Sequence, residues 1–232
     1  MNKVVVITGT RKGIGYSLCN YFLGQGDYVY GCSRRESDIL HENYSHFKLD
    51  VSDEVKVLNM IKEIYKTHQR IDILLNNAGA AAMNHAFLTP YATAQKMMNT
   101  NFFGTFLMCR EVGKLMLKNK TGRIINFTTV AVPLNLQGEL VYSASKAAIE
   151  QLTKVLAAEI GGLGITVNAI GPTPIQTDLI KNVPKDKIES LINSQSIKRI
   201  GTFDDVLNVV NFFVSPNSGF INGQIIYLGG IN

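Results

Sequence analysis

The 232-residue sequence has few cysteines and no hydrophobic run long enough to cross a membrane. Cys19, Cys32 and Cys109 are odd in number, far apart and set among apolar residues. They are therefore expected to be buried free thiols rather than disulfides or metal ligands. No apolar run approaches the roughly 20 residues that span a bilayer, and no signal-peptide pattern opens the chain. We expect a soluble, cytoplasmic protein.

The sequence also lacks the residue spacings of a metal site. Its histidines, His41, His46, His68 and His85, form no H-E-x-x-H pattern and have no C-x-x-C partner. We therefore predict no metal ion.

The charge is moderately basic, with a net charge of +5 and a pI near 9.0. The densest basic segment, Lys114 to Arg123, has no interleaved aromatic residues, so we interpret it as a solvated helix end rather than a nucleic-acid site. A positive balance also suits an anionic small ligand such as a dinucleotide phosphate. We favour that ligand, and expect neither a nucleic-acid nor a membrane partner.

Strand-like and helix-like segments alternate along the whole chain, without a repeat or a linker. Apolar, β-branched runs predict buried strands at about 3–7, 28–32, 46–49, 71–75, 123–127, 165–170 and 224–228. Helical spacing of apolar residues predicts helices at about 16–25, 52–65, 91–118, 142–159 and 204–214. The alternation predicts one α/β domain over residues 1–232, with a seven-stranded parallel sheet covered by helices on both faces.

A glycine-rich segment, Thr8 to Gly15, joins the first strand to the first helix. Glycines allow the backbone to approach a ligand closely, and the start of a helix offers unpaired N–H groups to a pyrophosphate. The alternative is a plain tight turn. The strand before it and the helix after it favour a nucleotide-binding turn.

Ser33-Arg34-Arg35 ends the second strand, where an enzyme that binds NAD usually has an acidic residue for the adenosine ribose. Here there is none. Guanidinium groups, together with Lys12 in the glycine turn, suit a 2′-phosphate. Arginines are also common on the surface after a strand, but we predict NADP rather than NAD.

Three further strand ends carry polar or small residues. Asp50 follows the third strand and either helps to cap the next helix or borders an adenine pocket. Asn76 to Gly79 follows the fourth strand, where a cofactor lies in open α/β sheets, although Asn and Gly also dominate ordinary turns. Gly171 to Pro174 follows the sixth strand.

Tyr142 and Lys146 are four residues apart in a predicted helix, so they lie on one face. An ammonium group favours the phenolate of a nearby tyrosine and so lowers its pKa, which would let the phenol exchange protons as a general acid. Asn101 is unexpected inside an apolar helix. Its buried amide either binds local backbone or belongs to the site.

In this order and at these separations, the motifs T-G-x-x-x-G-I-G at Thr8 to Gly15, N-N-A-G at Asn76 to Gly79, Asn101 and Y-x-x-x-K at Tyr142 to Lys146 resemble those of the short-chain dehydrogenase/reductase family. The resemblance covers nearly the full chain and is greatest to members of the 3-oxoacyl-acyl-carrier-protein reductase type. It implies a seven-stranded Rossmann fold with NADP across the strand ends, and a homotetramer, or else a homodimer, built through residues 91–118 and 142–160.

The resemblance also implies roles for single residues. Tyr142 would protonate the carbonyl oxygen, Lys146 would hold the nicotinamide ribose, and Asn101 would position a water molecule. Asp50 would lie by the adenine and Asn77 by the adenosine ribose, while Ile175 and Thr177 would lie near the carboxamide. The predicted catalytic residues are Asn101, Thr129, Tyr142 and Lys146. Cofactor contacts are predicted at Gly9, Arg11, Lys12, Gly13, Ile14, Gly15, Ser33, Arg34, Arg35, Asp50, Val51, Asn77, Ala78, Gly79, Tyr142, Lys146, Pro172, Ile175 and Thr177.

Two positions depart from the family pattern. Thr129 stands where the family has a substrate-orienting serine, and its extra methyl group restricts χ1. The hydroxyl therefore serves only if its rotamer points into the site; Thr128 is the alternative, but strand alternation turns it away. Thr173 stands where the family has glycine after Pro172, so we expect an ordinary φ there, and a shifted lid.

The predicted function is an NADPH-dependent reductase, or reverse dehydrogenase, of a carbonyl or alcohol substrate. The alternative is a catalytically retired NADP-binding sensor on the same fold. A polar segment at about 177–201 predicts a substrate lid. Apolar pocket walls are expected from Val132, Leu136, Leu179 and Ile180, with Lys181, Lys185 and Lys187 either meeting an acidic carrier or facing solvent.

Overall fold

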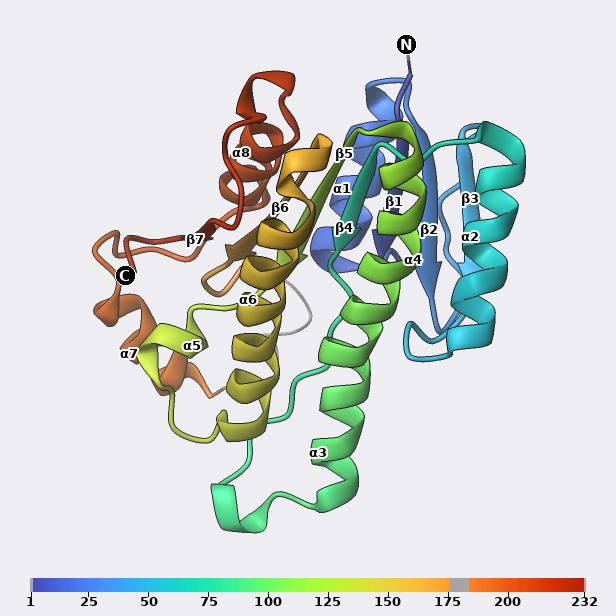
Figure 1. Cartoon of the computed structure of the whole chain (residues 1–232). Coiled ribbons are helices and arrows are strands. Elements are labelled where there is room, and N and C mark those ends of the chain that lie inside the picture. The colour runs from blue at the N-terminus through green and yellow to red at the C-terminus, as the bar shows by residue number, and fades with distance from the viewer. Residues whose placement is uncertain (1, 176–183, 232) are drawn as a thin grey trace.

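The computed structural model of the protein describes residues 2–175 and 184–231 as an α/β fold around one sheet (Figure 1). All neighbouring strands are parallel. The strands are β1 (Val4–Thr8), β2 (Tyr28–Ser33), β3 (Tyr44–Lys48), β4 (Ile73–Asn76), β5 (Gly122–Phe127), β6 (Ile165–Gly171) and β7 (Ile225–Tyr227). The predicted single-domain Rossmann fold with a seven-stranded parallel sheet is confirmed.

The strand order is β3-β2-β1-β4-β5-β6-β7. The sheet therefore grows in one direction from β1 to β3 and in the other from β4 to β7. Ligands bind in such sheets beyond the carboxyl ends of the strands, where the order reverses. In this sheet the strand order reverses between β1 and β4, so a ligand site is expected there.

Helices connect the strands and cover the sheet. The α-helices are α1 (Gly13–Gly24), α2 (Glu54–His68), α3 (Tyr91–Met98), α4 (Gly104–Asn119), α5 (Ala131–Leu134), α6 (Leu140–Ile160), α7 (Lys185–Ser194) and α8 (Phe203–Val214). The other helical segments are η1 (Ala86–Leu88), η2 (Asn99–Phe103), η3 (Gly161–Leu163) and η4 (Pro216–Ser218).

The core has two layers, one on each face of the sheet. One face packs against α2, α4 and α6 through side chains such as Ile64, Met108 and Ala157. The other packs against α1 and α8 through side chains such as Phe22 and Phe213. Figure 1 shows α4 and α6 in front of the strands, with α1 behind. Burial on both faces explains why the strands read as unbroken apolar runs.

The long helix predicted at 91–118 is present, but it is interrupted. Between α3 and α4, η2 is a π-helical turn. A π turn contains more residues than an α turn, changes which side chains face inward, and often occurs at functional sites. It turns Asn101 into the interior, where its exposed fraction is 0%.

The three cysteines are free and buried, as predicted. In the described ranges, no group of three or more His, Cys, Asp or Glu side chains could hold a metal ion. No helix there is long and apolar enough to span a membrane.

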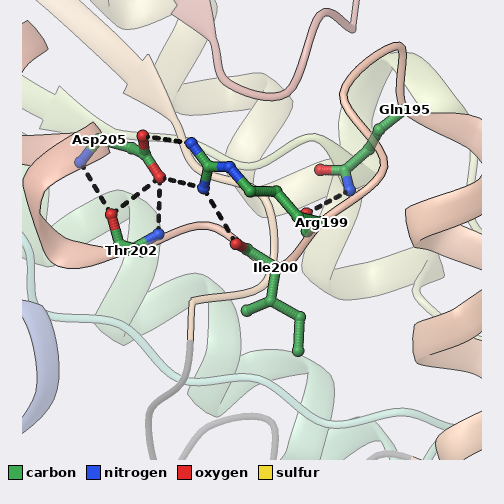
Figure 2. A network of polar contacts seen from close by, with 5 residues as sticks. All are labelled: Gln195, Arg199, Ile200, Thr202 and Asp205. Carbon is green, nitrogen blue, oxygen red and sulfur yellow. Dashed lines mark hydrogen bonds and ion pairs between the residues drawn. The ribbon is translucent and has the colours of Figure 1, made fainter.

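A polar network fixes the end of α7 to the start of α8 (Figure 2). The Arg199 guanidinium donates to both carboxylate oxygens of Asp205, at 2.6 and 2.8 Å, and to the carbonyl oxygen of Ile200 at 3.1 Å. Asp205 also accepts from the backbone N–H of Thr202, whose hydroxyl caps α8 in return. The buried Gln195 donates to the carbonyl of Arg199. These bonds set the position from which α7 extends toward the carboxyl ends of the strands.

Candidate active site

A cleft of about 1220 Å³ lies at the carboxyl ends of the strands. Most of the residues predicted to contact a cofactor or substrate line it. Those lining residues are Gly9, Arg11, Lys12, Gly13, Ile14, Ser33, Arg34, Arg35, Asp50, Val51, Asn77, Ala78, Gly79, Thr129, Tyr142, Lys146, Pro172 and Ile175. Thr177, Leu179, Ile180 and Lys181 lie outside the described residues.

The glycine turn has the backbone of an anion site. Gly9 and Gly13 have φ values of +76° and +62°, which side chains other than glycine rarely adopt. A Cβ on Gly9 would lie 2.9 Å from the Cα of Ala78. No side chain caps the start of α1, and no acidic residue lies in its first turn. The N–H groups there are therefore oriented toward the cleft as donors for a phosphate.

Gly15 has a different role from the one predicted. It does not line the cleft. A Cβ at this position would lie 2.3 Å from the carbonyl oxygen of Gly9 and 2.5 Å from the Asn77 side-chain nitrogen. Gly15 therefore allows α1 to pack closely under the turn.

Two residues of β3 that sequence reasoning missed support the Ser33–Arg35 segment. The Tyr44 hydroxyl lies 3.0 Å from Thr10 Oγ1, in the glycine turn, and 2.9 Å from His46 Nδ1. His46 Nε2 lies 2.9 Å from the carbonyl oxygen of Arg35 and therefore donates to it. These bonds connect the glycine turn to the end of β2. They therefore fix the backbone that carries Lys12 relative to the backbone that carries Arg34 and Arg35.

The signal for this support was a glycine within β2. A Cβ on Gly31 would lie 2.3 Å from the Tyr44 hydroxyl and 2.6 Å from Thr10 Oγ1. An isolated glycine inside a strand often marks the close approach of another group. Here that group is the Tyr44 phenol.

Asp50 and Asn77 line the cleft but also stabilise loops. Asp50 accepts from the backbone N–H and the hydroxyl of Ser52, at 3.0 and 2.8 Å. The cap of α2 is Asp53, which accepts from the N–H of Lys56. Asn77 donates to the carbonyl oxygens of Thr8 and Gly9. Asp50 therefore orders the turn before α2 but does not cap the helix, and its contact with the adenine stays a prediction.

Tyr142 and Thr129 meet at the centre of the cleft. Tyr142 is in the first turn of α6, and Thr129 follows β5. The two side chains lie close enough for hydrogen bonding between them to lower the pKa of Tyr142. Thr129 Oγ1 also accepts from the backbone N–H of Ala131 at 3.3 Å, and both residues line the cleft. Thr128 faces away, as predicted, with its hydroxyl donating at 2.6 Å to the buried Glu150.

The pKa of Tyr142 differs from the prediction. Burial is the largest cause and the charge of Glu139 a smaller one; together they raise the pKa to about 12, although hydrogen bonding to Thr129 lowers it. The expected lowering by Lys146 is therefore not found in the protein alone. Lys146 itself donates to the carbonyl oxygen of Phe127 at 2.7 Å, and burial lowers its pKa to about 8. Desolvation outweighs the attraction expected from sequence.

Asn101 does not line the cleft, and its side chain is fully engaged. Its Oδ1 accepts from the N–H of Ala80 at 2.7 Å. Its Nδ2 donates to the Ala80 carbonyl oxygen at 2.9 Å and to Ser145 Oγ at 2.8 Å. Asn101 therefore holds the loop after β4 to the helix that carries Tyr142. Its expected role in positioning a water molecule stays a prediction.

The loop after β6 behaves as expected at one position. Thr173, which replaces the family's glycine, does not have a positive φ.

Leu136 lines the cleft, but Val132 does not, so that part of the predicted apolar wall is wrong. Lys187 does line it.

Other residues that line the cleft were not predicted. They include Met83, Lys96, Thr100, Leu134, Glu139, Ile188 and Leu191. Their places in the cleft depend on contacts between distant segments, which a local sequence pattern does not reveal. For Glu139 the sequence did contain a signal, since this residue lies three positions before Tyr142.

Comparison with known proteins agrees with this arrangement. A family model described as enoyl-(acyl-carrier-protein) reductase matches residues 9–231. The 3-oxoacyl-acyl-carrier-protein reductase FabG of Buchnera aphidicola subsp. Schizaphis graminum is 32% identical, over 98% of this chain and 96% of its own. The chain belongs to the short-chain dehydrogenase/reductase family.

Solved structures of short-chain dehydrogenases/reductases resemble the whole chain. ElxO with NADP bound has a TM-score of 0.90 and 30% identity, over 98% of this chain and 97% of that one. A 4-hydroxyisoleucine dehydrogenase complexed with NADH has a TM-score of 0.89 and 26% identity, over 100% and 99%. This short-chain dehydrogenase/reductase is accordingly an NAD(P)-dependent oxidoreductase that acts on CH–OH or C=O groups.

Proposed function

We propose that the protein is an NADPH-dependent reductase of a carbonyl substrate, or a dehydrogenase in reverse, with Tyr142 as the general acid or base. The closeness of the Thr129 and Tyr142 side chains, in the same cleft as the glycine turn, is the observation that carries this proposal. A substrate oxygen that meets both hydroxyl groups receives two donors at the atom where negative charge develops.

The residues have separate tasks in this proposal. When bound, NADPH supplies the hydride. The Thr129 hydroxyl orients the substrate oxygen, and the Tyr142 hydroxyl gives it a proton. With a pKa of about 8, the Lys146 side chain is mostly protonated at neutral pH. Its charge then holds the ribose hydroxyls and stabilises the Tyr142 phenolate that proton transfer leaves behind.

The alternative of a catalytically retired sensor is less well supported. Its main argument was Thr129 in place of serine. Threonine keeps the hydroxyl group and lies close enough to Tyr142 to influence its pKa, so the substitution leaves a donor beside the proposed acid. NADPH oxidation with ketones, 3-oxoacyl thioesters and keto sugars is the direct test of the enzyme. Activity with none of these substrates would favour the sensor.

Preference for NADPH is the cofactor part of the proposal. Arg34 and Arg35 line the cleft beside Lys12, and the sequence has no acidic residue at the end of β2. Charged hydrogen bonds of this kind contribute about 1.5–3 kcal/mol each. We expect NADPH to bind at least about tenfold more tightly than NADH.

The double variant Arg34→Ala, Arg35→Ala should lose this preference in a fluorescence titration while keeping its NADH affinity. The double variant Lys62→Ala, Lys66→Ala removes the same charge from α2 and is the control. Equal affinity of the unaltered protein for the two cofactors would contradict the assignment.

A homotetramer, or a homodimer, is proposed for the assembly. Apolar side chains on α4 and α6 are exposed in the monomer, with exposed fractions of 41% at Phe106 and 46% at Val155. Analytical ultracentrifugation tests this, and a monomer would contradict it. The substrate lid at about 177–201 and the cytoplasmic location stay predictions; α7, within that range, does line the cleft.

A further inference from the structure

Glu139 lies beside the proposed acid and has no assigned role. It is the residue immediately before α6, and Tyr142 follows three positions later. Residues three apart share one face of a helix. Both side chains line the cleft. Glu139 therefore borders the part of the cleft where a substrate carbonyl would meet Tyr142.

The carboxylate of Glu139 is only incompletely satisfied by the protein. Its Oε2 is buried and has no hydrogen-bond partner, and its side chain does not cap α6. In the part of the chain that the structure describes, no ion pair involves it. A buried acceptor without a hydrogen-bond partner destabilises the protein, since it has lost its hydrogen bonds to water and has gained none within the protein. Such a group inside a ligand cleft is suited to a donor that arrives with the ligand.

The electrostatic environment places Glu139 close to the reacting groups. Burial raises the pKa of its own carboxyl group. Its charge also raises the pKa of Tyr142. These effects agree with the helical spacing, and they mean that a ligand donor facing Glu139 would be near the atoms that react.

The surroundings indicate which kind of donor fits. Apolar side chains, Leu134 and Leu136, line the cleft near Glu139 in sequence. Lys96 and Lys187 line the same cleft and would oppose an additional cation there. A neutral hydroxyl group can donate a hydrogen bond to the carboxylate without repulsion from the two lysines. An ammonium group could also donate, but the lysines would repel its charge.

We propose that Glu139 binds a hydroxyl group of the substrate, and that the substrate class is a hydroxylated ketone rather than a plain acyl chain. The inference rests on the proposed function and deepens it. A site built to bind a substrate hydroxyl discriminates strongly against the analogue that lacks it, because the buried protein group is then left unpaired.

Ring ketones that differ only in one hydroxyl group test this. Cyclohexanone and its 2-, 3- and 4-hydroxy derivatives are titrated calorimetrically into the protein loaded with NADP⁺, a complex that cannot reduce them, and the absorbance must show that their hydroxyl groups form no NADPH. We expect at least one hydroxyketone to bind about tenfold more tightly than cyclohexanone. Glu139→Gln should weaken that preference and Glu139→Ala should remove it.

Controls separate this inference from the proposed function. Glu159→Gln makes the same change at an exposed position of the same helix and should keep the preference. Circular dichroism and NADP⁺ affinity verify that each variant is folded. No preference in the unaltered protein, an undiminished one in Glu139→Ala, or tighter binding of 4-aminocyclohexanone would overturn the inference. Absence of NADPH oxidation with every carbonyl class would instead overturn the proposed function, and the inference with it.

Discussion

At the scale of single residues, the site depends on where two hydroxyl groups point. Residue type and spacing predicted Tyr142 and Thr129, but whether threonine could replace serine depended on its rotamer. In the structure its side chain lies within hydrogen-bonding reach of Tyr142. The methyl group is accommodated with Thr129 at only 9% exposure, so threonine provides the donor in a position that packing holds.

Thr129→Ser should keep most of the activity, whereas Thr129→Val should lose about 100-fold in kcat, the effect of removing one donor to a developing oxyanion. Valine has nearly the same shape, so NADPH affinity should stay unchanged. Steady-state kinetics with the best ketone measures both variants. A fully active valine variant would mean that another group orients the substrate.

The pH dependence follows from Lys146. Burial lowers the pKa of its ammonium group to about 8, while the pKa of Tyr142 is raised to about 12. Lys146 thus loses its proton first as the pH rises, and Tyr142 stays protonated. The apparent second-order rate constant for NADPH, at a fixed ketone concentration, should decline above about pH 8. A rate that stays constant from pH 7 to 10 would show that the charge of Lys146 is not required.

The direction of the Tyr142 pKa shift could not be predicted from sequence. Spacing predicted that Lys146 would be near, and attraction between opposite charges lowers the pKa of a phenol. Burial acts in the opposite direction, and it depends on which segments pack over the helix. Those segments, including the residues around Glu139, come together only in the folded chain.

At the scale of elements, the helix over 91–118 is the instructive case. Its length and apolar face were predictable, and so was the anomaly of Asn101. The π turn, η2, was not, because helical spacing of apolar residues does not distinguish one inserted residue in a long helix. The turn lets an amide reach Ala80 and Ser145 from inside the helix, joining three segments around the cleft.

Asn101→Ala should destabilise the protein and slow catalysis. It removes the partners of the partly buried Ala80 N–H and carbonyl groups and of the buried Ser145 hydroxyl, and a buried group left unpaired costs about 1–3 kcal/mol. Chemical denaturation should therefore give a free energy of unfolding lower by at least about 2 kcal/mol, and kcat should fall because Ser145, beside Tyr142, loses its fixed position.

Asn99→Ala is the matched control for this change, since Asn99 is in the same π turn but exposed. It should leave stability and kcat nearly unchanged. Wild-type stability in Asn101→Ala would mean that the amide bonds contribute nothing net.

At the scale of the whole molecule, the sheet could be predicted almost completely. Strand-like and helix-like segments that alternate along most of the chain leave few arrangements in which every connection is right-handed. The neighbours of each strand, and hence which strand ends meet, came from the structure. Strand order places the ends of β1, β2, β4 and β5 around one cleft, and this brings Arg34, Asn77 and Thr129 together across long stretches of sequence.

The parts that sequence did not predict share a cause. Residues of α7 and of the loop before α6 line the cleft in positions that depend on contacts with distant segments. The attachment of α7 through Arg199 and Asp205 is one such contact. Helices and strands can be predicted from the local sequence, whereas the substrate end of this cleft depends on contacts across the whole fold.

The central claim is that the Tyr142 hydroxyl delivers the proton, and single-turnover oxidation of bound NADPH tests it most directly. In Tyr142→Phe, the absorbance of bound NADPH should stay constant after a ketone is added, while NADPH affinity changes by no more than about twofold, since only one hydroxyl is lost. The unaltered protein should oxidise its NADPH under the same conditions. Oxidation at a comparable rate in Tyr142→Phe would contradict the account.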